Sequence, residues 1–209
     1  VNLFDTNVIC TKAKIPGEVI DSWTDLQPNE VITLDGKYGP INNLVSWKDE
    51  LYTYQDRGIA FLSIQPRVQV TGSDGISVEL GTGAVLAEYK YLTTNSGSIN
   101  KWGILAIETG MYYLDALNKS FNIIGSEFRG ISDTEGFHKY FLDNTELDSL
   151  RIDNPIIYRG TSIGWDKVTN DIYLSLFKSD DSKITLSLNI AQGGFSSFYD
   201  YHSSMYIHT

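Results

Sequence analysis

Alternation of apolar and polar residues is the feature that most restricts the fold of this 209-residue chain. Four aliphatic side chains alternate with three polar ones from Ile184 to Ile190, and residues 172–177 repeat the arrangement. Because successive side chains of a β-strand point to opposite faces, this pattern predicts strands with one buried face. The polar segment 178–183 lies between the two runs and favours a turn. We therefore predict an antiparallel hairpin.

The same arrangement recurs at residues 68–71 and 76–80, which flank the turn-forming dipeptide Asp74-Gly75. Two other runs, 58–64 and 110–114, are apolar almost throughout. Strands that are apolar on both faces lie between two layers, so we expect these runs to be central strands. The chain also has 13 Tyr and 18 Gly beside only 2 Met, which fits β-structure with tight turns. The predicted fold class is all-β.

One short helix is predicted near residues 133–143. Ser132 and Glu135 have the spacing of a capping box, in which each side chain bonds the backbone N–H of the other residue. Apolar residues at helical spacing follow, namely Phe137, Tyr140, Phe141 and Leu142. Gly136 opposes the helix because glycine loses more backbone freedom than other residues when it becomes helical.

A weak internal repeat groups the predicted strands. Trp47, Trp102 and Trp165 are 55 and 63 residues apart, and each precedes a strand, a turn and a second apolar strand. Such units resemble the blades of a β-propeller, here roughly residues 41–100, 101–160 and 161–209. Ordinary antiparallel meanders in a sandwich would give the same pattern, so the prediction is a partial β-propeller or propeller-like meanders.

The number of repeats bears on domain organisation. A propeller typically has ~4–8 blades, more than this chain can supply. The first residue, Val1, is not a methionine, and no signal-type segment follows it. We therefore expect residues 1–209 to be one β-rich segment of a larger protein.

The charge balance argues against several classes of function. Asp and Glu total 26 against 16 Lys and Arg, a formal charge of −10, whereas non-specific binding to nucleic acid requires clustered cations. No apolar run approaches the ~20 residues of a membrane-spanning helix. The single cysteine, Cys10, excludes an intrachain disulfide framework. We expect neither sequence-specific nucleic-acid binding nor a membrane span.

A search for catalytic motifs returns little. The sequence has no P-loop and no G-x-S-x-G nucleophile motif. His202 and His208 are separated by no recognised metal-ligand spacing. Asp56, Glu108 and Asp115 are candidates for the paired carboxylates of a glycosidase, although such residues more commonly cap turns. We predict that the chain is not an enzyme, and we assign no catalytic, cofactor-binding or metal-binding residue and no cofactor.

The aromatic residues allow two interpretations. Exposed Tyr and Trp could stack on sugar rings, as in a lectin, or aromatic side chains could fill the cores between sheets and the interfaces between proteins. We favour the second interpretation. The densest aromatic group, residues 195–201, would mark a partner surface if it is exposed.

Several short motifs occur in a recognisable order along the chain. They are GEVIDSW (17–23), YGPINNL (38–44), LY (51–52), QDR (55–57), GTG (81–83), YLTTNSG (91–97), NKW (100–102) and AQGGFSSFYDY (191–201). In this order they resemble the tail muzzle proteins, also called stabilisation proteins, of crAss-like bacteriophages of gut Bacteroidetes. None of the motifs is catalytic, and the resemblance rests on their common order along the chain. Where the family usually has a Pro after the Tyr-x-Tyr segment, this chain has His202.

This resemblance implies a structural virion protein that contains a β-propeller and lies at the distal end of a short tail. It would close or line the exit for DNA and ejected proteins, with other tail proteins and further copies or segments of itself as partners. An acidic surface would then repel phosphates and let DNA pass without binding. The alternative function is a carbohydrate-binding propeller or sandwich module for host recognition.

Overall fold

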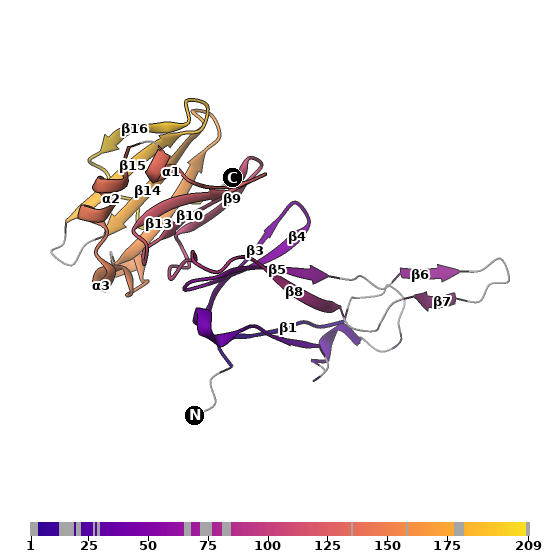
Figure 1. The fold of residues 1–209 in the computed structure, drawn as a ribbon. Helices are drawn as coiled ribbons and strands as arrows, with labels where there is room; N and C mark the ends of the chain where they lie inside the picture. The colour runs from indigo at the N-terminus through magenta and orange to yellow at the C-terminus, as the bar shows by residue number, and fades with distance from the viewer. Residues whose placement is uncertain are drawn as a thin grey trace.

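Three four-stranded antiparallel sheets form most of the molecule in the computed structural model (Figure 1). The structure describes residues 4–12, 19, 22–26, 28, 30–64, 68–71, 77–80, 85–134, 136–157, 159–177 and 182–207. Two smaller sheets, each with two strands, accompany them in this part of the chain. The prediction of an all-β, antiparallel fold is confirmed.

In the second and third large sheets, neighbouring strands follow one another along the chain, as in a meander. The first sheet differs because the strand pair of residues 68–71 and 77–80 lies in the chain between its third and fourth strands, which are neighbours. The first sheet contains β3 (Ile41–Trp47), β4 (Glu50–Gln55), β5 (Ile59–Ile64) and β8 (Leu86–Thr93). The second contains β9 (Ile104–Ile107), β10 (Gly110–Asp115), β11 (Ser120–Ile124) and β12 (Phe128–Gly130). The third contains β13 (Gly160–Asp166), β14 (Asp171–Phe177), β15 (Lys183–Asn189) and β16 (Gly194–Tyr199).

The two-stranded sheets lie at the N-terminal end of this order. Strand β1 (Asn7–Ile9) pairs with β2 (Val31–Thr33), and β6 (Val68–Thr71) pairs with β7 (Ser77–Leu80) in a hairpin that projects from the first sheet (Figure 1). Three short 3-10 turns complete the set, η1 (Ser22–Thr24), η2 (Gly36–Tyr38) and η3 (Pro155–Ile157).

The predicted hairpins and central strands are present. Strands β14 and β15 pair antiparallel, with Leu174 opposite Leu186, and β6 pairs with β7 as predicted. The turn predicted at 72–75 lies outside the described residues, as do residues 178–181 of the turn predicted at 178–183, whereas Lys183 is the first residue of β15. All six residues of β10 are buried, because this strand lies between β9 and β11 and has a sheet packed on each face.

The sheets stack face to face in chain order, and one hydrophobic core fills each space between neighbours. Ala60 and Leu62 of the first sheet pack toward β1 and β2. On the opposite face of the first sheet, Tyr54 packs against Tyr113 of the second. The other face of the second sheet packs against β14 and β15 of the third. Because successive side chains of a central strand point to opposite faces of its sheet, each such strand contributes residues to two neighbouring cores.

The stacking has features of a propeller, but the described residues form no closed ring. The first strands of successive large sheets lie beside one another, with β9 in contact with both β3 and β13. The propeller and its blade boundaries therefore remain predictions.

The helical segment differs from the prediction of one short helix near 133–143. In the part of this segment that the structure describes there are three short helices, α1 (Ile131–Thr134), α2 (His138–Asn144) and α3 (Leu147–Leu150). Gly136 adopts φ +75°, outside the helical region, so α1 and α2 are separate. The Ser132 hydroxyl accepts from Phe121 N instead of capping a helix (3.0 Å), and Glu135 lies outside the described residues. No helix that the structure describes is long and apolar enough to span a membrane.

Candidate functional site

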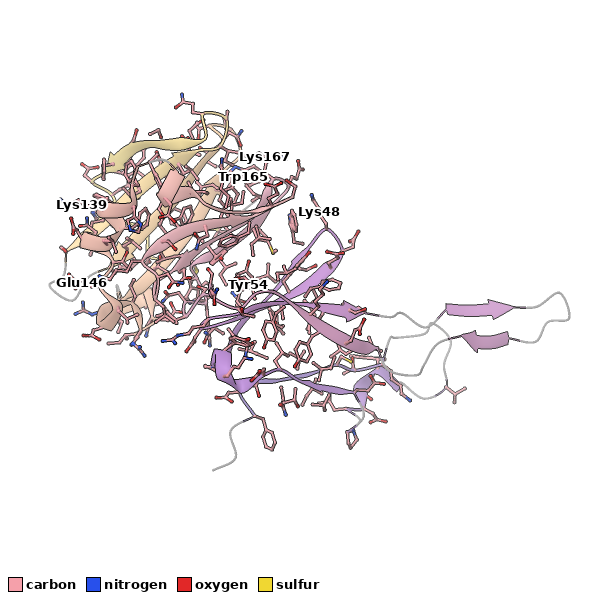
Figure 2. The ribbon with its side chains drawn as sticks, in the orientation of Figure 1. Lys48, Tyr54, Lys139, Glu146, Trp165 and Lys167 are labelled. Carbon is pink, nitrogen blue, oxygen red and sulfur yellow. The ribbon has the colours of Figure 1, made fainter. Side chains whose placement is uncertain are left out.

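The junction between the first and second sheets is the first candidate functional surface, and Figure 2 shows Tyr54 where these sheets meet. The rings of Tyr54 and Tyr113 meet edge to face at a centroid distance of 5.3 Å. The Tyr54 hydroxyl donates to the sulfur of Met111 (3.7 Å), and all three side chains are fully buried. Burial raises the pKa of both tyrosines, so both hydroxyls stay protonated.

Side chains of β3 add hydrogen bonds across the same junction. Asn42 Nδ2 donates to the Ser98 carbonyl (2.9 Å), and Asn43 Nδ2 donates to the Lys101 carbonyl (2.8 Å). At the far end of the strand, the indole N–H of Trp47 donates to the Ile107 carbonyl (2.7 Å). Trp102, another of the three tryptophans that define the internal repeat, lies at the next junction, where its carbonyl accepts from Ile163 N of β13 (3.1 Å). Two of the three repeat tryptophans, Trp47 and Trp102, are therefore located at sheet junctions.

A buried carboxylate fixes the connection between these two sheets. Asp115, at the end of β10, is 1% exposed. Its Oδ2 accepts from Ser96 Oγ (2.7 Å), Gly97 N (3.3 Å) and Asn118 Nδ2 (2.8 Å), and its Oδ1 accepts from Asn118 N (2.9 Å). The Ser96 hydroxyl in turn lies 2.7 Å from the Tyr113 hydroxyl. Asp115 therefore holds the connection after β8 against the β10–β11 turn.

Of the other two candidate carboxylates, Asp56 lies near the Asp115 cluster, since a Cβ on Gly97 would stand 2.8 Å from the Asp56 carbonyl carbon, whereas Glu108 lies apart from it. Asp56 is in the β4–β5 turn, where its Oδ1 accepts from Asn42 Nδ2 (2.7 Å). Glu108 is exposed in the β9–β10 turn, at the opposite end of β10 from Asp115. At ~3.4 Å per residue along β10, Glu108 and Asp115 are roughly 20 Å apart, which is beyond the range of paired glycosidase carboxylates. Asp115 itself is enclosed by its four donors.

The junction between the second and third sheets is aromatic. The rings of Phe121 and Phe141 stack at 6.3 Å with an interplanar angle of 5°. Phe195 of β16 lies 5.6 Å from Phe141 and 4.4 Å from Phe137. Phe195 of the predicted aromatic group 195–201 therefore belongs to this core, whereas Phe198 remains 61% exposed.

A C-terminal segment, residues 200–207, covers part of the outer face of the third sheet. His202 Nδ1 lies 2.9 Å from Thr185 Oγ1, and Ser162 Oγ donates to the Ser203 carbonyl (2.7 Å). The Tyr206 ring lies over Gly164, where a Cβ would stand 2.2 Å from the ring. Its hydroxyl is 3.0 Å from Ser175 Oγ. Small and hydroxyl-bearing residues on this face thus accommodate the segment.

An aromatic hollow of about 600 Å³ opens beside this segment. Tyr173, Tyr201 and Tyr206 line it together with the β13–β14 turn, where Val168 is 93% exposed. Burial raises the pKa of Tyr201 to about 12. Within the described ranges, no group of three or more His, Cys, Asp or Glu residues could hold a metal ion, and His208 lies outside these ranges.

Sequence reasoning did not find the buried Asp115 cluster or the C-terminal segment as a cover. Asp115 was singled out only for its carboxyl group, and its four donors come from two separate places in the chain, Ser96-Gly97 and Asn118. The available signals in the sequence were Ser96-Gly97, after β8, and Asn118, in the β10–β11 turn. These residues indicate a binding partner for Asp115 only once the fold brings the two segments together.

The geometry defines an antiparallel β protein built from stacked four-stranded sheets whose junctions are aromatic and hydrogen-bonded. The family model described as Crassvirus muzzle protein matches residues 1–209. The chain is also 30% identical over 202 residues to the muzzle protein of Bacteroides phage crAss001, covering 96% of this chain and 14% of that protein.

The chain belongs to the Crassvirus muzzle protein family. The predicted resemblance is confirmed, and the family places the chain among the structural components of the phage virion tail. The chain spans about a seventh of the length of the curated relative.

Proposed function

We propose that this chain helps to close or line the distal tail exit through which DNA and ejected proteins leave the virion. The observation that carries the proposal is the face-to-face stacking of three four-stranded sheets, in chain order, in a member of the muzzle family. Stacked sheets of this kind build rigid walls, because each central sheet is packed on both faces.

The three sheets are proposed as consecutive propeller blades within residues 41–100, 101–160 and 161–209. Each range contains one four-stranded sheet, and the contacts of β9 with β3 and β13 place the first strands of the sheets beside one another. In a propeller, the first strand of each blade lies nearest the central channel. Additional blades would come from other segments or copies of the muzzle protein, and the outer contacts from other tail proteins.

The acidic composition supports a non-adhesive wall. A formal charge of −10 repels phosphates, so DNA can move past such a surface without being retained. This part of the proposal requires the acidic residues to face the channel.

Cryo-electron microscopy of intact virions tests the position of the chain. The expected result is that these three sheets continue into further four-stranded sheets around the tail axis, at the distal tip. Their location on the outside of the tail, away from the exit, would contradict the proposal. A channel wall rich in Lys and Arg would contradict the argument from charge, but it would not contradict the proposed arrangement of the sheets around the tail axis.

The aromatic hollow at Tyr173, Tyr201 and Tyr206 supports one alternative, a carbohydrate-binding module. Exposed tyrosine rings beside a concave surface can stack on sugar rings. A glycan array would show saturable binding to one sugar class, lost in Tyr201→Ala and retained in Phe128→Ala, which removes an exposed ring elsewhere. Absence of binding to every glycan would exclude this alternative.

A further inference from the structure

A cationic groove lies on the side of the molecule formed by the β4–β5 and β10–β11 turns. It has a volume of about 680 Å³, and its positive side chains are Lys37, Arg57 and Arg151. They come from η2, from the β4–β5 turn and from the residue after α3. A smaller adjoining hollow shares all three and adds Asp56, the one acid among the lining residues of both hollows.

The two arginines have no partner for their charge within the part of the chain that the structure describes. Arg57 uses its backbone N–H, which donates to the Tyr38 carbonyl (3.0 Å), and Arg151 uses its own toward the Leu147 carbonyl (2.9 Å). Neither guanidinium forms an ion pair or a hydrogen bond with these residues. Lys37 differs, because its ammonium lies 3.1 Å from a carboxylate oxygen of Asp35.

Unpaired arginines are unexpected in a chain with 26 acidic residues. A guanidinium presents a planar fork of donors that matches a carboxylate or phosphate group, whereas Asp56, the acid beside these arginines, accepts from Asn42 Nδ2 (2.7 Å). Here the fold directs Arg57 and Arg151 from two different elements into one groove. The groove therefore has the chemistry of a receptor for an anion that comes from outside the chain.

The overall charge decides between the possible anions. A nucleic acid carries a phosphate charge about every 1.7 Å along the duplex, so a bound strand would bring many negative charges to a chain whose formal charge is already −10. A short protein segment with a few carboxylates fits between the turns and brings less negative charge close to the rest of the molecule.

We propose that this groove binds a short acidic segment of a neighbouring protein chain, whose carboxylates pair with Arg57 and Arg151. Because the lining residues belong to η2, two turns and the end of α3, the bound segment would bridge the first and second sheets and the connection to the third. The groove is thus an assembly contact distinct from the sheet junctions.

Titration of the chain with a synthetic hexaglutamate peptide tests this proposal, with binding followed by calorimetry and by NMR shifts of the groove residues. We expect saturable binding to the wild-type chain, and a loss of affinity of about fivefold in each of Arg57→Gln and Arg151→Gln. The affinity of the wild-type chain for hexaglutamate should also fall when the salt concentration rises from about 0.05 to about 0.5 M, because salt screens the attraction between the charges.

Three controls keep the test specific. Arg129→Gln removes the same charge from exposed strand β12, outside the groove, and should bind hexaglutamate as the wild type does. Hexaglutamine should not bind, and circular dichroism should show that each variant is folded. The proposal is overturned if hexaglutamate fails to bind, if Arg129→Gln weakens binding as much as the groove variants, or if a 12-nucleotide single strand binds more tightly than hexaglutamate.

Discussion

Replacing Asp115 tests whether the connection between the first two sheets depends on one buried carboxylate. The Asp115 side chain accepts four hydrogen bonds, three on Oδ2 and one on Oδ1. In Asp115→Ala all four donors lose their acceptor, and those of Ser96 and Gly97 are buried. We expect this variant to lose the attachment of the β8–β9 connection to the β10–β11 turn.

The magnitude follows from the number and kind of bonds. A hydrogen bond to a charged group contributes ~1.5–3 kcal/mol, but the four are not additive, and removing the carboxylate also removes its own desolvation penalty. We expect Asp115→Ala to lower the free energy of unfolding by about 3–4 kcal/mol. In Asp115→Asn the amide oxygen can keep the three bonds at Oδ2, while the amide N–H group then faces Asn118 N–H, so about 2 kcal/mol is expected.

Equilibrium unfolding in urea, followed by tryptophan fluorescence, measures both values. Asp166→Asn is the matched control, because Asp166 also accepts from a turn N–H, that of Val168 (2.8 Å), but lies at the surface. This control should leave the unfolding midpoint close to that of the wild type. An Asp115→Ala midpoint equal to that of Asp166→Asn would refute the assigned role of the buried carboxylate.

Three further predictions concern the sheet junctions and the C-terminal segment. Met111→Ala should lower the free energy of unfolding in urea by about 2–4 kcal/mol, because it leaves a cavity at a fully buried site beside the Tyr54 hydroxyl. An effect below about 1 kcal/mol would contradict this packing. Gly164→Ala should displace the Tyr206 ring and speed amide hydrogen exchange at residues 200–207, while β14 stays protected. Ser197→Ala, at an exposed position of β16, is the control and should leave this exchange unchanged. Unchanged exchange in Gly164→Ala would contradict the close contact between Gly164 and the Tyr206 ring. Burial, followed by the charge of Lys183, lowers the pKa of His202 below its ordinary value of 6.5, so the unfolded chain binds the proton more readily than the folded one. The resulting stabilisation is present above pH 6.5 and is lost as the pH falls through the folded-state pKa. The protection factors at residues 200–207, which correct the exchange rates for their intrinsic dependence on pH, should therefore fall below pH 6.5 in the wild type and should lose this pH dependence in His202→Gln.

The strands that the sequence predicts most clearly are those with a complete alternating or fully apolar pattern. Leu174 and Leu186 lie on the core face that their alternation predicts, and β10 is buried on both faces as its apolar run predicts. Such patterns are local, and a strand with an apolar face must bury that face wherever it lies in the fold.

The helical region was predicted less well, because its signals conflict. The capping-box spacing and the apolar residues favour one helix, but Gly136 interrupts it and Ser132 bonds to Phe121 of a distant strand. Tertiary packing against β11 therefore overrides the local preference of these residues.

The candidate functional surfaces needed the three-dimensional arrangement. Nothing in the spacing of Arg57 and Arg151 along the sequence indicates that they share a groove. The four donors around Asp115 likewise come together because two turns from different sheets are neighbours. Sequence order defines each sheet, but the adjacency of turns depends on how the sheets stack.

The sequence by itself determined the strands, their hairpin pairing and the family, because alternation and collinear motifs are properties of the chain order. The tertiary structure decided which aromatic side chains form sheet junctions, which carboxylate is buried and which arginines share a groove. These depend on burial and on contacts between residues far apart in the chain. The physical reason is that a period of two specifies which face of a strand is apolar, whereas the identity of the opposing face is fixed only when the sheets pack.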